Sequence, residues 1–280
     1  MGQPHVAPVI ADGPMKDVKR FTKDDSYLDR LVVVTSTNHA YVDVTENWLS
    51  SIRRTGNPHP NIHIVAEDEL AYNALVKSTA GENIVHIRKA PNLSTNMTLI
   101  FDTPEYKRFC NKRPQYILDL LKSGHDVLFS DVDILWFQKP YPTFYSDSTD
   151  DDAKKADIYV MQDQAPPRQI FCAGFVMYRS TDVTIKWVEK WIVELERRNH
   201  KRPDQEILNM MVKGNVKDVP PALLEVLNPE KYLSGQNYFN DTWRAENTHI
   251  QPIVLHNNWI VGHEAKVQRF KDLGTWYTKS

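Results

Sequence analysis

The sequence lacks the features that mark several common protein classes. It contains only two cysteines in 280 residues, Cys110 and Cys172, which excludes a disulfide-dense scaffold and leaves room for at most one bridge. No stretch approaches the roughly twenty continuous apolar residues that span a bilayer, and no hydrophobic signal core is recognisable, so we expect no membrane contact by this chain. The formal net charge of -2 argues against a nucleic-acid partner held by a general basic field.

Internal repeats, low-complexity tracts and a clear linker are also missing. Residues 1–27 combine glycines and prolines without apolar periodicity, which predicts a flexible leader. The remaining residues, 28–280, belong to a chain that is 41% hydrophobic and 25% charged, and we expect them to form a single domain. Its nucleotide-binding half would span about 28–137 and its acceptor and sugar half about 138–280.

Short apolar runs alternate with helical patterns along the chain. We predict strands at 31–36, 61–66, 84–87, 127–130, 158–161, 171–178 and 253–255, and helices at 44–52, 70–77, 104–122, 183–198 and from 204 onward. Trp187 and Trp191 recur at helical spacing and are predicted to pack in the core. The alternation predicts an α/β fold with a Rossmann-like, mostly parallel sheet flanked by helices, a small antiparallel addition in the second half, and ligands outside the carboxyl ends of the strands.

Two carboxylates, Asp131 and Asp133, follow the apolar run 127–129 and precede a second apolar run. Unpaired carboxylates are costly in an apolar setting, whereas oxygen ligands at the rim of a sheet can hold a divalent cation. If the strand continues, both side chains point to one side, and if it turns they fan around an ion. This pattern predicts a metal site, and the alternative is two solvated aspartates in a turn.

Two further segments could approach a ligand. Lys112 and Arg113 stand at the start of a helix, where they could face a phosphate or simply be exposed. Ala173 and Gly174 place two small residues in an otherwise bulky strand, which indicates close approach of a ligand or a packing requirement.

The last two segments lie in the second half. Asp204 and Gln205 open a helix, where a carboxylate is electrostatically favoured with or without a function. His256 follows a strand and could be a third metal ligand or a structural histidine. Lys266, beyond Gly262, could reach a phosphate.

In this order, the segments resemble glycosyltransferase family 77, a family of nucleotide-diphospho-sugar transferases. The resemblance covers roughly residues 31–276 and rests on the following motifs: Ser130-Asp131-Val132-Asp133 through Pro140, Lys112-Arg113-Pro114, Cys172-Ala173-Gly174-Phe175, Asp204-Gln205, and His256-Asn257-Asn258-Trp259-Ile260. It implies a GT-A fold, a Mn²⁺ or Mg²⁺ ion, a UDP-sugar donor and transfer with retention of anomeric configuration.

The resemblance also implies roles for residues. The metal ligands would be Asp131, Asp133 and His256, with Asp131 also near the ribose. Such an ion neutralises the charge that grows on the departing diphosphate. The nucleoside and the rest of the donor would contact Thr35, Ser36, Thr37, Asn38, Arg113, Ala173, Gly174, Gly262 and Lys266. The residues at the donor sugar would be Asp204, Gln205 and Lys112, and the sequence leaves a covalent and a front-side retaining route equally open.

Two alternatives compete with this interpretation. A haloacid-dehalogenase-type phosphohydrolase also begins with a strand ending in Asp-x-Asp, but it requires Thr or Val two residues past the second aspartate, where this chain has Leu135. The other alternative is a non-catalytic binder of sugar nucleotides or glycans that keeps the metal site.

The expected substrates are a UDP-sugar, with galactose or xylose favoured, and a glycan or glycoprotein acceptor. Trp243, Trp259 and Trp276 are the first candidates for stacking on that glycan. Asn-x-Ser/Thr sequons at Asn92 and Asn96, with a third at 240, suit a Golgi lumenal enzyme, whereas an authentic Met1 would suit the cytosol.

Overall fold

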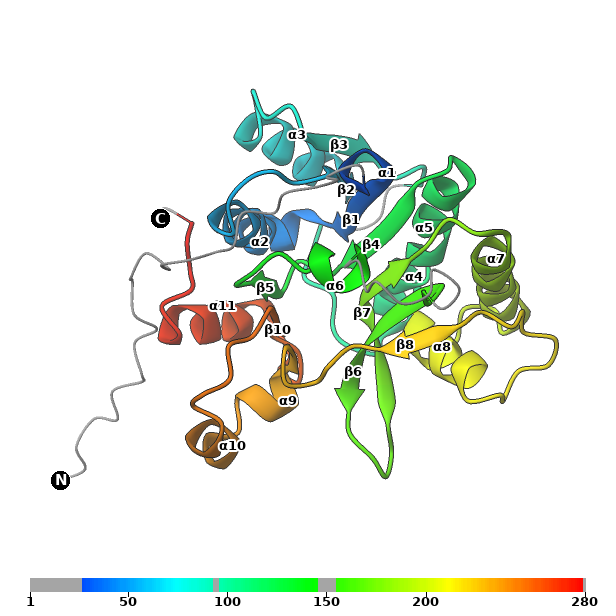
Figure 1. The fold of residues 1–280 in the computed structure, drawn as a ribbon. Helices are drawn as coiled ribbons and strands as arrows, with labels where there is room; N and C mark the ends of the chain where they lie inside the picture. The colour runs from blue at the N-terminus through cyan, green and yellow to red at the C-terminus, as the bar shows by residue number, and fades with distance from the viewer. Residues whose placement is uncertain (1–26, 93–95, 146–154, 279–280) are drawn as a thin grey trace.

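The computed structural model describes residues 27–92, 96–145 and 155–278, so the predicted leader lies outside it apart from Tyr27 (Figure 1). The strands are β1 (Leu31–Thr37), β2 (Asn61–Ala66), β3 (Val85–Lys89), β4 (Asp126–Ser130), β5 (Ile134–Trp136), β6 (Ile158–Gln164), β7 (Ile170–Tyr178), β8 (Leu224–Val226), β9 (Tyr232–Ser234) and β10 (Val254–His256). The helices are α1 (Tyr27–Arg30), η1 (His39–Tyr41), α2 (Val42–Arg54), α3 (Glu69–Ser78), α4 (Pro104–Cys110), α5 (Arg113–Lys122), α6 (Tyr141–Tyr145), α7 (Asp182–Arg197), α8 (Asp204–Val212), α9 (Gly235–Tyr238), α10 (Asp241–Glu246) and α11 (His263–Asp272).

Seven strands form the central sheet in the order β3-β2-β1-β4-β7-β6-β8. Strands β3, β2, β1 and β4 run parallel, β7 is antiparallel to β4 and β6, and β8 is parallel to β6. After β1 the chain builds β2 and β3 on one side and then returns to β4 on the other, so the strand order reverses between β1 and β4. Sheets of this kind bind ligands outside the carboxyl ends of the strands at that reversal.

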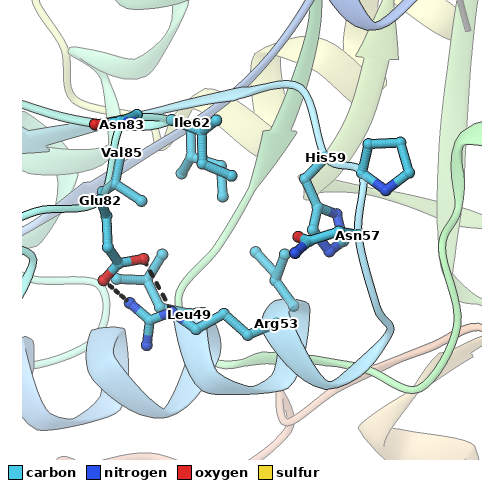
Figure 2. Close-up of a pocket in the computed structure, with 11 residues that line it drawn as sticks. Leu49, Arg53, Asn57, His59, Ile62, Glu82, Asn83 and Val85 are labelled. Atoms are coloured by element: carbon cyan, nitrogen blue, oxygen red, sulfur yellow. Dashed lines mark hydrogen bonds and ion pairs between the residues drawn. The ribbon is translucent and has the colours of Figure 1, made fainter.

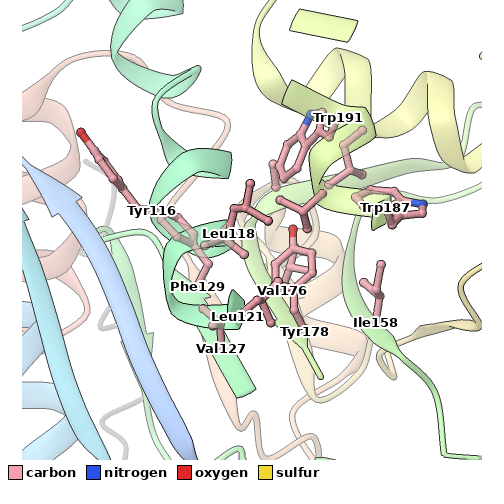
Figure 3. Close-up of a cluster of buried hydrophobic side chains, with 14 of the residues drawn as sticks. Tyr116, Leu118, Leu121, Val127, Phe129, Ile158, Val176, Tyr178, Trp187 and Trp191 are labelled. Atoms are coloured by element: carbon pink, nitrogen blue, oxygen red, sulfur yellow. The ribbon is translucent and has the colours of Figure 1, made fainter. Parts of the chain in front are cut away.

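Helices cover both faces of the sheet (Figure 1). On one face α5, α7 and α8 pack over β4 and β7, and Figure 3 shows Tyr116 of α5 and Trp191 of α7 in this cluster. On the other face α2 and α3 pack over β1 and β2 through Trp48 and Leu75. Trp187 and Trp191 are 4% and 0% exposed, which confirms their predicted place in the core.

The start of α7 shows why the sequence forms a helix there. The Thr181 hydroxyl accepts a hydrogen bond from the Thr184 backbone N–H at 3.2 Å, which satisfies one of the free donors at the helix N-terminus. Asp182 adds a negative charge to the first turn, where the helix dipole favours it.

A second, three-stranded sheet has the order β5-β10-β9. Strand β10 is antiparallel to β5 and parallel to β9, so His256 lies opposite Ile134. This sheet confirms the predicted antiparallel addition. It also brings a strand from near the C-terminus beside the chain that leaves β4.

The predicted single helix over 104–122 is wrong. The structure has two helices, α4 ending at Cys110 and α5 beginning at Arg113, with a turn between them. Pro114 lies in the first turn of α5 and has no N–H to donate to the carbonyl of Cys110, so a continuous helix would lose that hydrogen bond.

A pocket of about 460 Å³ lies away from the carboxyl edge, between the end of α2 and the starts of β2 and β3 (Figure 2). Ile52, Ile62 and Val85 are among its apolar lining residues, and Arg53 and Glu82 form an ion pair beside them. His59 also lines the pocket, and its Nδ1 lies 3.0 Å from the Tyr141 hydroxyl.

Protein stability should fall in mild acid partly because of His59. Burial, together with the charge of Lys139, lowers the pKa of His59 to about 4. The unfolded chain takes up this proton near pH 6.5, whereas the folded chain resists it down to about pH 4, so stability is lost as pH falls through this window. We expect His59 to account for about 2 kcal/mol of that loss in urea denaturation from pH 7 to pH 4.

The matched control is His249, which is exposed. His59→Gln should flatten the pH dependence of the unfolding free energy, while His249→Gln should leave it as in the parent protein. Equal slopes for the parent and His59→Gln would disprove the assignment.

Candidate active site

Asp131 and Asp133 lie in the turn that joins β4 to β5. Asp131 N donates to the Gly174 carbonyl at 2.7 Å, and Ile134 N donates to the Asp131 carbonyl at 3.3 Å. The strand therefore turns after Ser130 instead of continuing. The two carboxylates accordingly spread around a common point at the carboxyl end of β4, next to the reversal of strand order.

His256 reaches the same point through the small sheet. Asn257 N donates to the Asp133 carbonyl at 2.9 Å, which anchors the end of β10 beside this turn. The His256 Nε2 atom lies 3.2 Å from Asp133 Oδ1 and 3.8 Å from Asp131 Oδ2. One ligand atom from each side chain lies within 4.8 Å of the others. Two carboxylate oxygens and an imidazole nitrogen suit a divalent ion such as Mn²⁺ and leave coordination positions for a substrate.

The other imidazole nitrogen also has a partner. His256 Nδ1 lies 3.3 Å from Cys172 Sγ, and the same sulfur accepts the Gly174 N–H at 3.3 Å. Burial raises the pKa of the Cys172 thiol, so it remains protonated. Contacts of this kind fix the ring orientation of a metal-binding histidine, here with Nε2 toward the carboxylates.

Gly174 is required by its closeness to these ligands. A Cβ atom at this position would lie 2.2 Å from Asp131 Oδ2 and 2.9 Å from His256 Cε1. Both distances are shorter than real Cβ contacts, so any side chain would displace the Asp131 carboxylate or the His256 ring.

Gly174→Ala should therefore weaken Mn²⁺ binding by about 10- to 100-fold, as measured by calorimetry in the presence of UDP. The expected loss comes from displaced carboxylate and imidazole groups. Circular dichroism should stay unchanged, because β7 keeps its backbone hydrogen bonds. A variant with the affinity of the parent protein would show that the small residue has only a packing role.

Lys266 completes the charge balance of Asp133. Its Nζ lies 2.6 Å from Asp133 Oδ2 and donates to the Asn257 carbonyl at 2.8 Å. Burial alone would raise the pKa of Asp133, but Lys266 and His256 outweigh it and hold that pKa well below its usual range. The backbone of Gly262, which precedes α11, has φ +97°, a conformation that other residues rarely adopt.

Arg113 joins two acids beneath the site. Its Nη2 lies 2.9 Å from Asp131 Oδ1 and its Nη1 lies 3.0 Å from Asp204 Oδ2, with the side chain only 9% exposed. Burial raises the pKa of Asp204 to about 6, and the nearby Asp131 adds to this while Arg113 opposes it. In this arrangement the guanidinium positions two carboxylates, and its predicted contact with the donor stays a prediction.

Gln205 lies beside Asp204 and contacts the strand of small residues. Its Oε1 accepts the Ala173 N–H at 3.0 Å, and its Nε2 donates to Asp163 Oδ2 at 3.2 Å. The first turn of α8 is thereby fixed against β7. Of the predicted donor-sugar residues, Asp204 is linked to Asp131 because both contact Arg113. Gln205 bonds to Ala173, the residue before Gly174.

Lys112 points elsewhere than Arg113. Its Nζ lies 2.6 Å from both Glu67 Oε2 and the Asn92 carbonyl, and the Tyr116 hydroxyl donates to Glu67 Oε1 at 2.6 Å. Burial raises the pKa of Glu67 although Lys112 and Tyr116 oppose this. The predicted catalytic lysine is therefore held at the carboxyl end of β2, apart from Asp204.

Most of the side chains at the end of β1 are buried, and two of them form hydrogen bonds within the protein. Thr35, Thr37 and Asn38 are at most 2% exposed. Thr37 Oγ1 accepts from the Thr45 hydroxyl at 2.9 Å, and Asn38 Nδ2 donates to the Met97 carbonyl at 2.8 Å. The remaining member, Ser36, is partly exposed. Nucleoside contacts by these side chains stay a prediction.

Asp163 is a site residue that sequence reasoning missed. It lies near the end of β6, is 8% exposed, and accepts hydrogen bonds from three side chains. Its donors are Gln205 at 3.2 Å, Asn258 at 2.5 Å and Trp259 at 3.1 Å. A carboxylate after the apolar run 158–161 is the same signal that identified Asp131, and it could have identified this residue too.

The architecture has close counterparts among solved structures. Galactosyltransferase LgtC, in complex with donor and acceptor sugar analogues, matches with a TM-score of 0.55 and 15% identity over 89% of this chain and 97% of that chain. The glycosyltransferase GlyE of Streptococcus pneumoniae matches with a TM-score of 0.54 and 17% identity over 90% of this chain and 61% of that chain. At these identities the likeness shows the fold, which is the GT-A glycosyltransferase fold, as predicted.

Sequence comparison gives the family. Residues 57–270 match the family model described as nucleotide-diphospho-sugar transferase, and the chain belongs to this family. An Arabidopsis thaliana UDP-D-xylose:L-fucose alpha-1,3-D-xylosyltransferase is 28% identical over 88% of this chain and 69% of its own length. A Dictyostelium discoideum UDP-galactose:fucoside alpha-3-galactosyltransferase is also 28% identical, over 88% of this chain and 43% of its own length. The chain is thus a nucleotide-sugar glycosyltransferase, and the predicted family is confirmed.

Proposed function

We propose that this chain is a metal-dependent, retaining glycosyltransferase that moves galactose or xylose from a UDP-sugar to a glycan or glycoprotein hydroxyl. The observation that carries the proposal is the convergence of Asp131, Asp133 and His256 at the carboxyl edge of the sheet. A Mn²⁺ or Mg²⁺ ion held by these three residues would act as a Lewis acid on the departing diphosphate.

The surrounding residues prepare the site for an anion. Lys266 lies 2.6 Å from Asp133, so its ammonium group can donate a charge-assisted hydrogen bond to a phosphate oxygen at the same point. Arg113 keeps Asp131 oriented from below. Gly174, which has no side chain, leaves room for the Asp131 carboxylate and the His256 ring.

The state of Asp204 favours the front-side route. Its carboxylate is 2% exposed and paired with Arg113, which makes it a poor nucleophile. In a front-side reaction the acceptor oxygen forms a bond to the anomeric carbon on the face from which UDP leaves. The bond between that carbon and the β-phosphate oxygen breaks, and the acceptor proton passes to this phosphate oxygen. Asp204 and Gln205 then serve to orient the sugar.

The relatives guide the choice of substrates. Their names specify UDP-xylose with L-fucose in one case and UDP-galactose with a fucoside in the other. We therefore propose a fucose-containing glycan as the acceptor class.

The test is incubation of the chain with UDP-xylose or UDP-galactose and Mn²⁺, with and without methyl α-L-fucoside. We expect release of UDP, dependence on the metal, and an α-linked disaccharide by NMR. Binding without turnover would favour the non-catalytic alternative, and a β-linked product would refute retention. The phosphohydrolase alternative finds no support in the family of the chain.

We also propose that the protein works in the Golgi lumen. No helix within the described residues is long and apolar enough to cross a membrane. The sequon residues Asn92 and Asn96 are exposed, which suits modification in that compartment. A tagged protein in its own cells should co-localise with Golgi markers, and a cytosolic distribution would contradict this assignment.

A further inference from the structure

The structure separates the three tryptophans that the sequence offered for glycan stacking. Trp276 stacks on Phe270 with ring centroids 6.2 Å apart and an interplanar angle of 21°, so one ring face is already covered. Trp243 lies on α10 with its ring 6.5 Å from that of Tyr238. Trp259, three residues after the metal-site histidine, is 49% exposed.

Trp259 is held in an unusual way. Its backbone has φ +57°, a left-handed conformation that is strained for a bulky side chain and persists only where the surroundings enforce it. Its indole N–H donates to Asp163 Oδ1 at 3.1 Å, and the neighbouring Asn258 donates to the same oxygen at 2.5 Å. Asn258 Oδ1 in turn accepts the Gly235 N–H at 2.7 Å, which ties this segment to the start of α9.

Asp163 connects this ring to the donor-sugar residues. Its second oxygen accepts the Gln205 amide at 3.2 Å, so a single buried carboxylate separates the indole edge from Gln205. The edge of the ring is therefore fixed toward the site, while about half of the residue is open to solvent. Val261, two residues further on, is also exposed, at 64%.

We propose that Trp259 is a specificity-determining residue that stacks on the acceptor sugar and that Asp163 positions it. This inference deepens the proposed function and rests on it. A pyranose presents a face of C–H groups, which carry partial positive charge and pack well on the negative face of an aromatic ring. A ring already fixed at its edge loses little conformational freedom on binding. The acceptor rather than the donor is the occupant, because Asp163 stands between the ring and the donor-sugar residues.

The experiment measures Michaelis constants for methyl α-L-fucoside and for the UDP-sugar separately. Trp259→Leu should raise the acceptor KM by roughly tenfold and change the donor KM by less than about twofold. Trp243→Leu, which removes a partly buried indole on α10, should change neither constant by more than about twofold. An unchanged acceptor KM in Trp259→Leu, or an equal rise in both constants, would overturn the proposal.

A second measurement uses the unaltered fold. In protein labelled with 5-fluorotryptophan, the ¹⁹F signal of residue 259 should shift when methyl α-L-fucoside is added with UDP and Mn²⁺ present, and the signal of residue 243 should not. Trp259→Phe identifies the signal. Absence of a shift at saturating acceptor would refute the stacking, even if Trp259→Leu fails to fold. A parent enzyme that releases no UDP would refute the proposed function instead, so the two failures are distinguishable.

Discussion

Asp133→Asn is expected to lower the rate of sugar transfer by about a thousandfold, the largest effect on activity that we predict. Asp133 contacts both His256 and Lys266, and its negative charge faces both groups. The amide keeps the shape of the side chain but loses that charge. Mn²⁺ binding in the presence of UDP, measured by calorimetry, should disappear together with activity.

The control for this variant is Asp119→Asn. Asp119 is exposed on α5, and its carboxylate accepts a hydrogen bond from Gln115 at 2.7 Å. Its replacement should leave metal binding and transfer unchanged. Full activity in Asp133→Asn would show that Asp133 does not hold the proposed ion. The proposed mechanism would then lose its basis.

Arg113→Met should cause the largest loss of stability, about 3–5 kcal/mol in the free energy of unfolding. Methionine nearly fills the space of the arginine stem but leaves Asp131 and Asp204 without their shared cation. The buried Asp204 and the partly exposed Asp131 then repel each other, and the pKa of Asp204 should rise further. Denaturant titration at pH 7.5 measures the loss.

The companion variant is Arg113→Met with Asp204→Asn. Removing one of the two uncompensated charges should recover part of the lost stability, although Asp131 remains unpaired. A double variant that is less stable than Arg113→Met would show that the pair contributes through packing and not through charge. Arg113→Lys should be less stable than the parent protein, since one ammonium group cannot bond to both acids as the guanidinium does.

The sheet, and the position of the two aspartates at its edge, were predictable for a physical reason. Continuous β-branched runs such as 32–35 favour a buried strand, and carboxylates at the end of such a run are costly unless they are paired or solvated. The connection of His256 to Asp133 came from the family resemblance, because the pairing of β10 with β5 joins residues more than a hundred positions apart.

Other parts of the site depended on information that a linear pattern does not contain. Lys112 and Arg113 are adjacent in sequence, yet one contacts Glu67 and the other Asp131 and Asp204. The turn before α5 sets these directions, and the sequence pattern suggested one continuous helix instead. The partners of Asp163 likewise come from α8 and the segment after β10, so its role appears only when these segments meet.

The pairing of β5 with β10 also determines when the site exists during synthesis. A nascent chain that has emerged through β8 carries every strand of the central sheet and both aspartates, but neither the imidazole nor Lys266. If the proposed metal site is correct, high-affinity metal uptake has to wait until β10 and the start of α11 have emerged. Manganese affinity would then report whether β10 has paired with β5, and we expect a preparation clipped ahead of residue 250 to keep its Rossmann-like body while lacking that affinity.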